Sequence, residues 1–500
     1  MFLFLLSIAL ITYLFIKHQQ RSAKFPPGPY SLPLIGNLPQ IIYHVWREKG
    51  IVPAFDLFRK TYGDVYTMWL GPFPHVNITD YETSQEVFIK NGHAFKDRFL
   101  PPIFEIVSDG FGLLFANGEG WAEMRRFTLL TFRNMGVGRN IMEEKILTEL
   151  DVRCAELDSQ AVDGKTVVQT SEFFNLTVGS VINSFLIGKR FDDTNKNEFL
   201  ELKKMLMESE ELFTMFDLMA PVWFLKRFFP KRLEKVLSVQ NLILDYVSRD
   251  AKQRLEEMKA GRYHIDTENP QDFVDAYFAK MEQEERNGGK SYYSFECLRH
   301  VLFDLWIAGT DTTATTLTSG FNHLVRNPEV LKKIREELLK VTDGGSRPLS
   351  LKDRAVTKYT NATLAEIQRH ASILNLNFWR ITHEPTTVKG FPVDAGALIT
   401  AQLSALHAND EVFPDPDKFD PERFLKNEAL LNQVIPFGIG KRSCVGENIA
   451  KSELYLMFGN LVLRYDVKPH GEMPSTANMM PYAAGKFPDP EVKLEFVKLR

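Results

Sequence analysis

One cysteine, Cys444, lies in a glycine-containing segment with the sequence PFGIGKRSCVG. A helical pattern follows directly over residues 447–454. A cysteine at the start of a helix is close to free backbone N–H groups and to the positive end of the helix dipole, and both favour its thiolate form. Gly440 and Gly446 remove side chains and let a flat ligand lie close, while Arg442 adds a cation. The segment therefore predicts a thiolate that binds a soft metal ion from one side.

Two simpler explanations are a buried structural cysteine and a zinc site. The zinc site is disfavoured because no second Cys or His lies at ligand spacing near Cys444. The structural explanation is disfavoured because the segment contains the whole pattern Phe-x-x-Gly-x-Arg-x-Cys-x-Gly, with its five specified positions filled by Phe437, Gly440, Arg442, Cys444 and Gly446. This pattern resembles the haem-binding loop of the cytochrome P-450 family. The resemblance implies that the Cys444 thiolate ligates the iron of haem b and that the other four residues bind the cofactor.

The composition sets limits on the class of protein. The chain has 500 residues, a hydrophobic fraction of 44% and 39 phenylalanines, which are enough for a large core. The formal net charge of −4 argues against a nucleic-acid partner. The three cysteines are odd in number and widely spaced, which argues against a disulfide framework. Because no clean linker interrupts the chain, we expect one catalytic domain over residues 37–500.

The first 16 residues are almost wholly apolar. As a helix they would be about 24 Å long, against about 27 Å for the reticulum bilayer. Basic residues follow the apolar run, which orients the rest of the chain toward the cytoplasm, whereas a cleaved signal peptide would have its charges before the run. We therefore expect a single-pass anchor in the endoplasmic reticulum membrane over residues 1–17. Residues 18–36 are basic and proline-rich and predict a stiff hinge.

Residues 120–131 predict a helix with Trp121 and Arg125 on one face, four residues apart. A surface stacking pair is the simpler explanation, but the spacing resembles the Trp-x-x-x-Arg pair that contacts a haem propionate in the family. Arg126 and Arg133 add positive charge nearby. That charge suits either an acidic electron-donor protein or plain solvation.

Two further arginines are assigned to the cofactor by the resemblance. Arg98 lies in residues 95–114, which show no sustained period and predict a long loop with a function. Arg380 occupies the position where the family places Arg or His toward a propionate, although Trp379 stands where a proline is usual.

Residues 295–325 predict a long internal helix that carries the polar run AGTDTT at 308–313. Buried acids and hydroxyls cost stability unless they are paired, and Gly309 removes a side chain, so we expect a local groove there. A polar helix end or cap is the alternative. The run matches the oxygen-binding motif of the family, which implies that Thr312 hydrogen-bonds dioxygen and that Asp311 relays protons.

Glu366 and Arg369 are three residues apart in a further predicted helix and can form an ion pair. Arg423 follows downstream in the sequence PERF. Together these residues resemble the family's Glu-x-x-Arg and Pro-Glu-Arg-Phe triad, to which we assign folding and haem retention.

The motifs occur in family order along nearly the whole chain and resemble the animal microsomal branch that metabolises xenobiotics and lipids. The resemblance implies a mainly α fold with a small β region. It also implies a monooxygenase that inserts one atom of dioxygen into a lipophilic xenobiotic, fatty acid or steroid-like substrate. Electrons would come from NADPH through NADPH-cytochrome P-450 reductase, with cytochrome b5 as a second candidate donor.

Three points stay open on the sequence alone. A haem-thiolate isomerase or dehydratase acting on peroxides is one alternative, and a non-catalytic haem-binding protein is another. The presence of Asp311 and Thr312 favours the monooxygenase over both. Residues 211–230 are dense in Phe, Met and Trp and predict either core packing or an apolar lip at the membrane.

Overall fold

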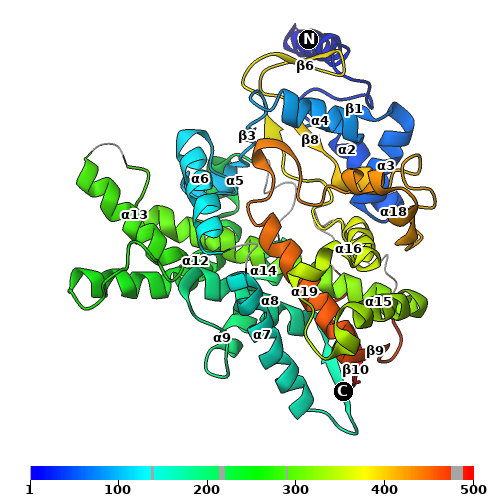
Figure 1. Cartoon of the computed structure of the whole chain (residues 1–500). Coiled ribbons are helices and arrows are strands. Elements are labelled where there is room, and N and C mark those ends of the chain that lie inside the picture. The colour runs from blue at the N-terminus through cyan, green and yellow to red at the C-terminus, as the bar shows by residue number, and fades with distance from the viewer. Residues whose placement is uncertain (1, 137–139, 213–219, 289–290, 474–487, 500) are drawn as a thin grey trace.

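The structure is a computed structural model, and it describes residues 2–136, 140–212, 220–288, 291–473 and 488–499. Helices make up most of the described chain, and the strands form three small sheets (Figure 1). The expected mainly α fold with a small β region is therefore confirmed. The N-terminal helix lies at one end of the molecule, beyond the largest sheet, and the C-terminal strand lies at the other end.

The centre of the molecule is α14 (Phe295–Arg326), the long internal helix that the sequence predicts. It begins at the cap residue Ser294, whose hydroxyl accepts a hydrogen bond from the backbone N–H of Cys297 at 3.1 Å. Apolar residues occur on all faces of α14, so neighbouring elements must pack against every face. That cover comes mainly from α8 (Thr170–Ile187), α12 (Pro230–Lys259), α16 (Lys358–Ala371) and α19 (Glu447–Arg464), and from α7 (Asn140–Ser159) behind α8 and α19.

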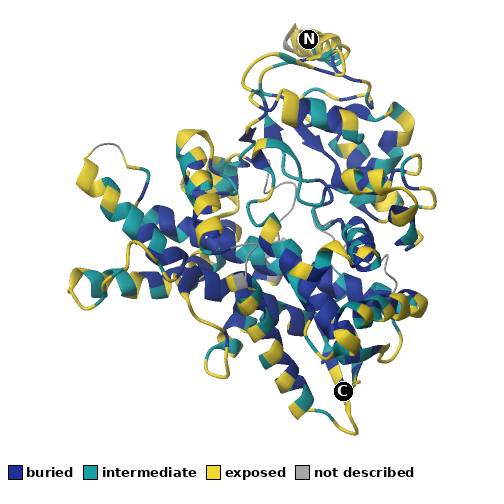
Figure 2. Cartoon of the chain, in the orientation of Figure 1, coloured by how far each residue is buried: buried dark blue, intermediate teal, exposed yellow. Residues whose placement is uncertain are grey.

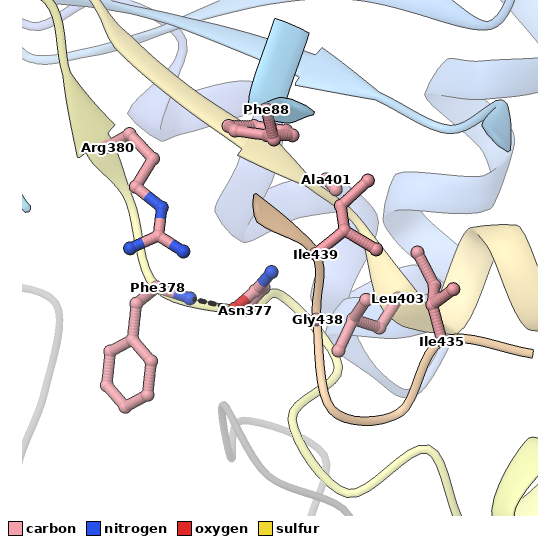
Figure 3. A pocket seen from close by; sticks show the side chains of 9 residues that line it. All are labelled: Phe88, Asn377, Phe378, Arg380, Ala401, Leu403, Ile435, Gly438 and Ile439. Atoms are coloured by element: carbon pink, nitrogen blue, oxygen red, sulfur yellow. Dashed lines mark hydrogen bonds between the residues drawn. The ribbon is translucent and has the colours of Figure 1, made fainter. Parts of the chain in front are cut away.

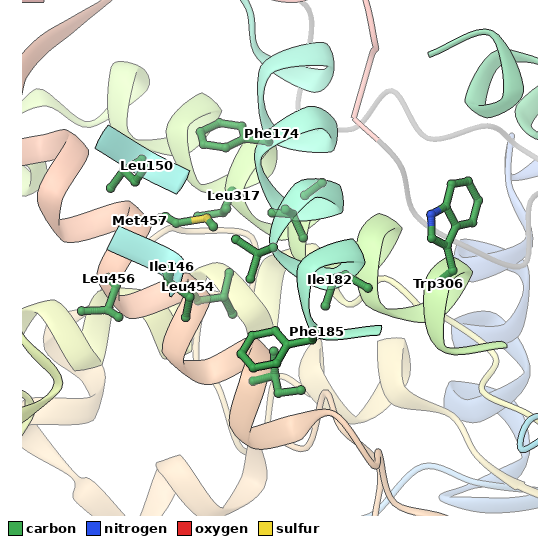
Figure 4. Packing of buried hydrophobic residues seen from close by; sticks show 14 of the residues in the cluster. Ile146, Leu150, Phe174, Ile182, Phe185, Trp306, Leu317, Leu454, Leu456 and Met457 are labelled. Carbon is green, nitrogen blue, oxygen red and sulfur yellow. The ribbon is translucent and has the colours of Figure 1, made fainter. Parts of the chain in front are cut away.

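Interlocking aliphatic and aromatic side chains fill the space between these helices. In Figure 4, Phe174, Ile182 and Phe185 of α8 lie among Leu317 of α14 and Met457 of α19. Buried residues concentrate around this centre, and exposed residues dominate the N-terminal helix and the outer loops (Figure 2). The core therefore gives α14 and α19 a fixed separation.

The remaining α-helices surround this centre. They are α1 (Phe2–Ser22), α2 (Leu38–Arg47), α3 (Ile51–Tyr62), α4 (Tyr81–Gln85), α5 (Pro102–Ser108), α6 (Gly118–Asn134), α9 (Lys196–Leu212), α11 (Val222–Phe228), α13 (Phe273–Asn287), α15 (Pro328–Val341), α17 (Leu403–His407) and α18 (Glu422–Lys426). A π-helical turn, η1 (Glu86–Lys90), and the 3-10 turns η2 (Asp343–Gly345), η3 (Leu351–Ala355), η4 (Glu428–Gln433) and η5 (Gly440–Arg442) complete the helical elements.

The largest sheet has the strand order β1 (Val65–Leu70), β2 (Phe73–Ile78), β8 (Leu398–Ala401), β5 (Arg380–Ile381) and β3 (Asp97–Arg98). Strand β8 runs parallel to β2, and the other neighbours are antiparallel. The register places Arg98 directly opposite Arg380. This pairing brings together two arginines that are far apart in the sequence.

Two smaller sheets lie elsewhere. One has the order β4 (Lys165–Gln169), β10 (Lys493–Lys498) and β9 (Tyr465–Pro469). The other is the hairpin of β6 (Thr386–Val388) and β7 (Phe391–Val393). Lys389 and Gly390 both adopt positive φ and turn the chain between these two strands.

The expected loop over residues 95–114 is wrong in part, because it contains β3 and α5. Helix α5 begins at Pro102, where proline is tolerated because the first helical N–H needs no partner within the helix. The segment at 211–230 becomes α11 from Val222, and residues 213–219 lie outside the described part of the chain. A loop over residues 473–486 that caps the substrate pocket is a further sequence expectation, and all of it except Met473 lies outside the described residues.

Helix α1 continues through Ser22, past the expected end of the anchor, and its last turn packs on the largest sheet. The indole N–H of Trp69 donates to the Ser22 hydroxyl at 3.2 Å, and the Arg21 guanidinium lies 5.1 Å from the Trp69 ring centroid. Arg21 also pairs with Asp394 at 2.9 Å. Among the helices of the described residues, none combines the length and the hydropathy that crossing a membrane requires.

Candidate functional site

The loop that carries Cys444 is folded back on itself just before α19. The backbone N–H of Cys444 donates to the carbonyl of Phe437 at 2.9 Å, and Gly438 donates to Ile435 at the same distance. The side chain of Phe437 lies under the ammonium group of Lys451, 5.4 Å from its ring centroid. These contacts fix the cysteine at the N-terminal end of α19, as the sequence predicts.

The sulfur of Cys444 has accessible surface, yet the protein around it raises the pKa of its thiol through desolvation. The two observations agree if the accessible surface faces an enclosed space. The backbone N–H of Gly446 and the cations Arg125 and Arg98 act in the opposite direction and lower that pKa. The helix end thus favours the thiolate as the sequence predicts, but desolvation has the larger effect on this pKa. A bound metal cation would stabilise the thiolate further.

The two glycines of the loop have different roles. Gly440 has a φ of +78°, and a Cβ at this position would lie 2.0 Å from the carbonyl oxygen of Phe88. Only glycine fits there, because both the backbone conformation and the contact with η1 exclude a side chain. Gly446 has an ordinary φ of −93°, and its nearest contact would be the Cys444 sulfur at 3.9 Å. Gly446 thus leaves the space beside the sulfur open.

Four arginines converge near the sulfur from separate elements. Arg98 and Arg380 face each other across β3 and β5, Arg125 comes from α6, and Arg442 comes from the cysteine loop. Arg125 donates to the Ser443 hydroxyl at 3.3 Å, which ties α6 to the loop. Like charges opposite each other on neighbouring strands are destabilising unless something neutralises them.

The pKa values of these arginines respond to that crowding. Burial, and then the charge of Arg98, lower the pKa of Arg442 to about 8. Burial and the charge of Arg125 lower the pKa of Arg98 to about 10, although Asp304 and Cys444 oppose this. Burial and the other three guanidinium groups lower the pKa of Arg380 well below its usual range. Because a guanidinium keeps its proton in proteins, these shifts indicate a site that favours anions.

Hydrogen-bonding atoms of this cluster remain unused. Nε of Arg98, Nη1 of Arg380 and Nη1 of Arg442 are buried without a hydrogen-bond partner among the described residues. Such donors are costly unless a ligand accepts from them. A flat ligand with carboxylate arms and a central metal cation would neutralise the guanidinium groups and bind the sulfur. The residues present therefore fit haem b.

The aromatic partner in this cluster differs from the expected one. The sequence pairs Trp121 with Arg125, but the Arg125 guanidinium lies 5.9 Å from the Trp121 ring centroid and that of Arg442 lies only 3.4 Å away. Sequence reasoning also missed Asn117. Its carbonyl oxygen accepts from Arg442 at 2.5 Å and from the backbone N–H of Arg98 at 2.9 Å. An asparagine just before the predicted Trp121 helix was the available signal.

A pocket lies between the cysteine loop and the edge of the largest sheet (Figure 3). Figure 3 shows Arg380 and Phe378 on one side of it and Gly438 and Ile439 of the loop on the other. Its lining consists of Phe88, Asn377, Phe378, Arg380, Ala401, Leu403, Ile435, Gly438 and Ile439. The Phe378 backbone N–H donates to Asn377 Oδ1 at 2.8 Å, which fixes the turn that delivers Arg380.

The polar run of α14 is arranged differently from the expectation. The hydroxyl of Thr312 donates to the Ala308 carbonyl at 2.8 Å. Gly309 forms no groove for a ligand, because a Cβ there would lie 3.0 Å from Ile182 of α8. It allows close packing of two helices. The carboxylate of Asp311 forms an ion pair with Lys203 of α9, a partner that the sequence did not indicate.

The triad assembles as predicted. Glu366 is fully buried and accepts from Arg369 at 2.8 and 2.9 Å and from Arg423 at 3.1 Å. Burial opposes ionisation, but hydrogen bonds and charge from Arg369 and His370 outweigh it and lower the pKa of Glu366 to about 2. Arg369 also donates to the carbonyls of His407 and Pro416 at 2.8 and 2.7 Å. The triad thus connects α16 to the segment that precedes the cysteine loop.

Comparisons with known proteins identify the family of the chain. The family model described as Cytochrome P450 matches residues 26–496. A Caenorhabditis elegans protein described as "Probable cytochrome P450 cyp-35D1" is 54% identical over 100% of both chains. Cytochrome P450 2C23 of Rattus norvegicus is 33% identical over 92% of this chain and 91% of its own. Cytochrome P450 2C8 of Homo sapiens is 33% identical over 90% of this chain and 89% of its own. The chain therefore belongs to the cytochrome P450 family and is a cytochrome P450 monooxygenase.

Proposed function

We propose that the chain oxidises a lipophilic small molecule, such as a xenobiotic, a fatty acid or a steroid-like compound, with electrons from NADPH passed on by a reductase. In balance, substrate, dioxygen, NADPH and one proton give hydroxylated substrate, water and NADP⁺. The observation that carries the proposal is the convergence of three buried arginines and the half-buried Arg125 on the space beside Cys444. A cationic pocket beside one sulfur suits haem b and few other ligands.

The proposed binding roles follow from chemistry at named atoms. The Cys444 sulfur would ligate the iron, and Arg98, Arg125, Arg380 and Arg442 would bind the two propionates through their free N–H groups. Trp121 would keep the Arg442 guanidinium in place through the contact between them. When bound, haem supplies the activation of dioxygen and the insertion of oxygen.

We assign proton handling to Thr312 and Asp311. The proton of the Thr312 hydroxyl points to the Ala308 carbonyl, so its oxygen keeps free lone pairs that can accept a hydrogen bond. Asp311 retains some exposure, with 20% of its side chain accessible, so water can reach its carboxylate. A carboxylate in the residue next to a hydroxyl can take up a proton that bulk solvent delivers through water and release it inward.

The substrate space adjoins an aromatic group. Phe104 stacks on Phe115 with ring centroids 4.4 Å apart, and Phe115 meets Phe378 edge-on at 6.0 Å. The Arg98 guanidinium lies 4.3 Å from the Phe378 ring centroid, so this group reaches the arginine cluster. Aromatic walls favour apolar substrates but discriminate weakly between them.

We further propose association with the endoplasmic reticulum membrane, with residues 1–17 as the anchor, residues 18–36 as the hinge and residues 37–500 as a cytoplasmic catalytic domain. Supporting this, the apolar side chains of α1 are largely exposed, including Phe2 at 78% and Ile11 at 65%. Exposed apolar surface of this extent suits lipid. The reductase, with cytochrome b5 as a second donor, would dock on the exposed basic face near Arg126.

The test is the absorption spectrum of the expressed protein, reduced and then exposed to carbon monoxide. We expect a strongly red-shifted Soret band that is lost in Cys444→Ser. Consumption of NADPH with reductase and a panel of lipophilic compounds then separates a monooxygenase from a peroxide isomerase, which needs no NADPH. A spectrum typical of histidine-ligated haem, or no bound haem, would refute the proposed site.

A further inference from the structure

A lysine of α9 enters the protein interior and contacts the polar run of α14. The ammonium group of Lys203 pairs with Oδ1 of Asp311, and only 7% of the Lys203 side chain is accessible. The next residue, Lys204, points outward and is exposed. Removing an ammonium ion from water is costly unless a counter-charge is present. Asp311 supplies a counter-charge for the buried Lys203.

The ion pair also determines where the Asp311 carboxylate lies. Successive side chains on a helix point about 100° apart, so Asp311 and its neighbour Thr312 face different directions. The Thr312 hydroxyl lies back along α14, against the Ala308 carbonyl. The carboxylate instead lies toward α9, where Lys203 holds it. The acid and the hydroxyl are thus each held by a separate interaction.

We propose, on the basis of the function proposed above, that Lys203 is a positioning residue for proton relay: its ammonium group holds the Asp311 carboxylate in place beside α9. A carboxylate held there can take up a proton that bulk solvent delivers through water and then release it inward, which returns the carboxylate to its starting state. Helix α9 thereby becomes part of the catalytic apparatus without touching the reacting atoms.

A purely structural role makes a different prediction. If Lys203 only ties α9 to α14, its removal lowers stability but leaves proton relay unchanged. If Lys203 positions Asp311, its removal has the same effect on proton relay as removal of the carboxylate, and the two changes together are no worse than either alone.

The experiment uses the haem-loaded protein with reductase and one substrate from the panel. The variants are Lys203→Met, Lys203→Arg, Asp311→Asn and the double variant Lys203→Met/Asp311→Asn, with Lys204→Met as the matched exposed control. Each is first checked for its carbon monoxide band. We then measure product formed per NADPH consumed, the solvent isotope effect on turnover, and denaturant unfolding.

We expect Lys203→Met and Asp311→Asn each to lower turnover about 100-fold or more, with a larger solvent isotope effect and no further loss in the double variant. Lys203→Arg should restore most of the turnover because it retains the charge, and Lys204→Met should match the original protein. In denaturant unfolding, Asp311→Asn should change the unfolding equilibrium constant about tenfold less in the Lys203→Met variant than in the original protein.

The proposal is overturned if Lys203→Met keeps normal coupling and isotope effect while only its stability falls. It is also overturned if Lys203→Arg fails to restore turnover despite a normal carbon monoxide band. If Lys203→Met does not retain haem, Lys203→Gln takes its place in every comparison. Failure of the proposed function would appear separately, as loss of the carbon monoxide band in the unsubstituted protein.

Discussion

The charge of Glu366 is predicted to be a large contributor to stability. The carboxylate is fully buried and receives three N–H bonds from Arg369 and Arg423, and a fourth from the backbone N–H of Asp420 at 2.9 Å. Glu366→Gln preserves the shape but replaces one oxygen with an amide that cannot accept. Two buried guanidinium groups would then lack their counter-charge, a change that typically costs about 3–5 kcal/mol.

The pKa of Glu366 gives an independent magnitude. Its displacement from 4.5 to about 2 corresponds to about 3 kcal/mol of folding free energy. Because the pKa is lower in the folded protein than in the unfolded chain, this stabilisation is fully present above about pH 4.5. It is lost as the pH falls from there through about 2. The two magnitudes agree, so we expect Glu366→Gln to lose about 3–5 kcal/mol at pH 7.

The assay is urea unfolding of the haem-loaded protein at pH 7 and at pH 3.5, monitored by tryptophan fluorescence. The deficit of Glu366→Gln should be smaller at the lower pH, because the original protein then loses part of the stabilisation. Glu422→Gln is the matched control, since Glu422 is an exposed carboxylate paired with Lys333. Its unfolding midpoint should change little.

If Glu366→Gln lost less than about 1 kcal/mol of unfolding free energy at pH 7, the reasoning would be refuted, because an exposed ion pair contributes that much. If the loss of stability were the same at both pH values, the electrostatic explanation would be refuted and a packing defect would explain the loss instead. Haem content measured in parallel distinguishes loss of cofactor from loss of fold.

Three further changes test other parts of the site. Gly440→Ala should abolish haem retention, measured from the carbon monoxide spectrum, because the φ of +78° and the close backbone contact exclude a Cβ; Gly438→Ala, with φ +66° and open space, should retain it. Arg380→Met should raise the unfolding midpoint of the haem-free protein and speed haem loss, because it removes one of several crowded charges; equal midpoints would contradict this. Burial raises the pKa of Asp304 to about 6, so its ionised form costs stability above that pH and the cost is relieved as the pH falls through 6. The backbone N–H groups of Leu113 and Leu114 donate to Asp304 at 2.6 and 2.9 Å, so Asp304→Ala should speed their hydrogen exchange. Asp304→Asn should keep these amides protected from exchange but remove the pH dependence of stability.

Short-range features of the site were predictable from the sequence. The position of Cys444 at a helix start depends on residues within one loop. Glu366 and Arg369 lie on one helix face, where three-residue spacing alone brings them together. The long apolar run that became α14 likewise carried its own helical signal. In each case the physical cause is local backbone geometry.

Longer-range features were decided by tertiary structure. The sequence assigned Arg98 and Arg380 to a cofactor by resemblance, but only the pairing of β3 with β5 placed them opposite each other. The stacking of Arg442 on Trp121 depends on the approach of α6 to the cysteine loop. Neither contact has a spacing that could be read along the chain, because each joins segments that only the packed core holds together.

The residues 309–312 show the division most clearly. The sequence alone determined that an acid and a hydroxyl lie in the middle of an apolar helix, because Asp311 and Thr312 stand inside a long apolar segment. Only the packing of α8 against α14 decided that Gly309 serves helix contact. Only the position of α9 decided that Asp311 meets Lys203, because a buried charge takes whichever counter-charge the fold brings within reach.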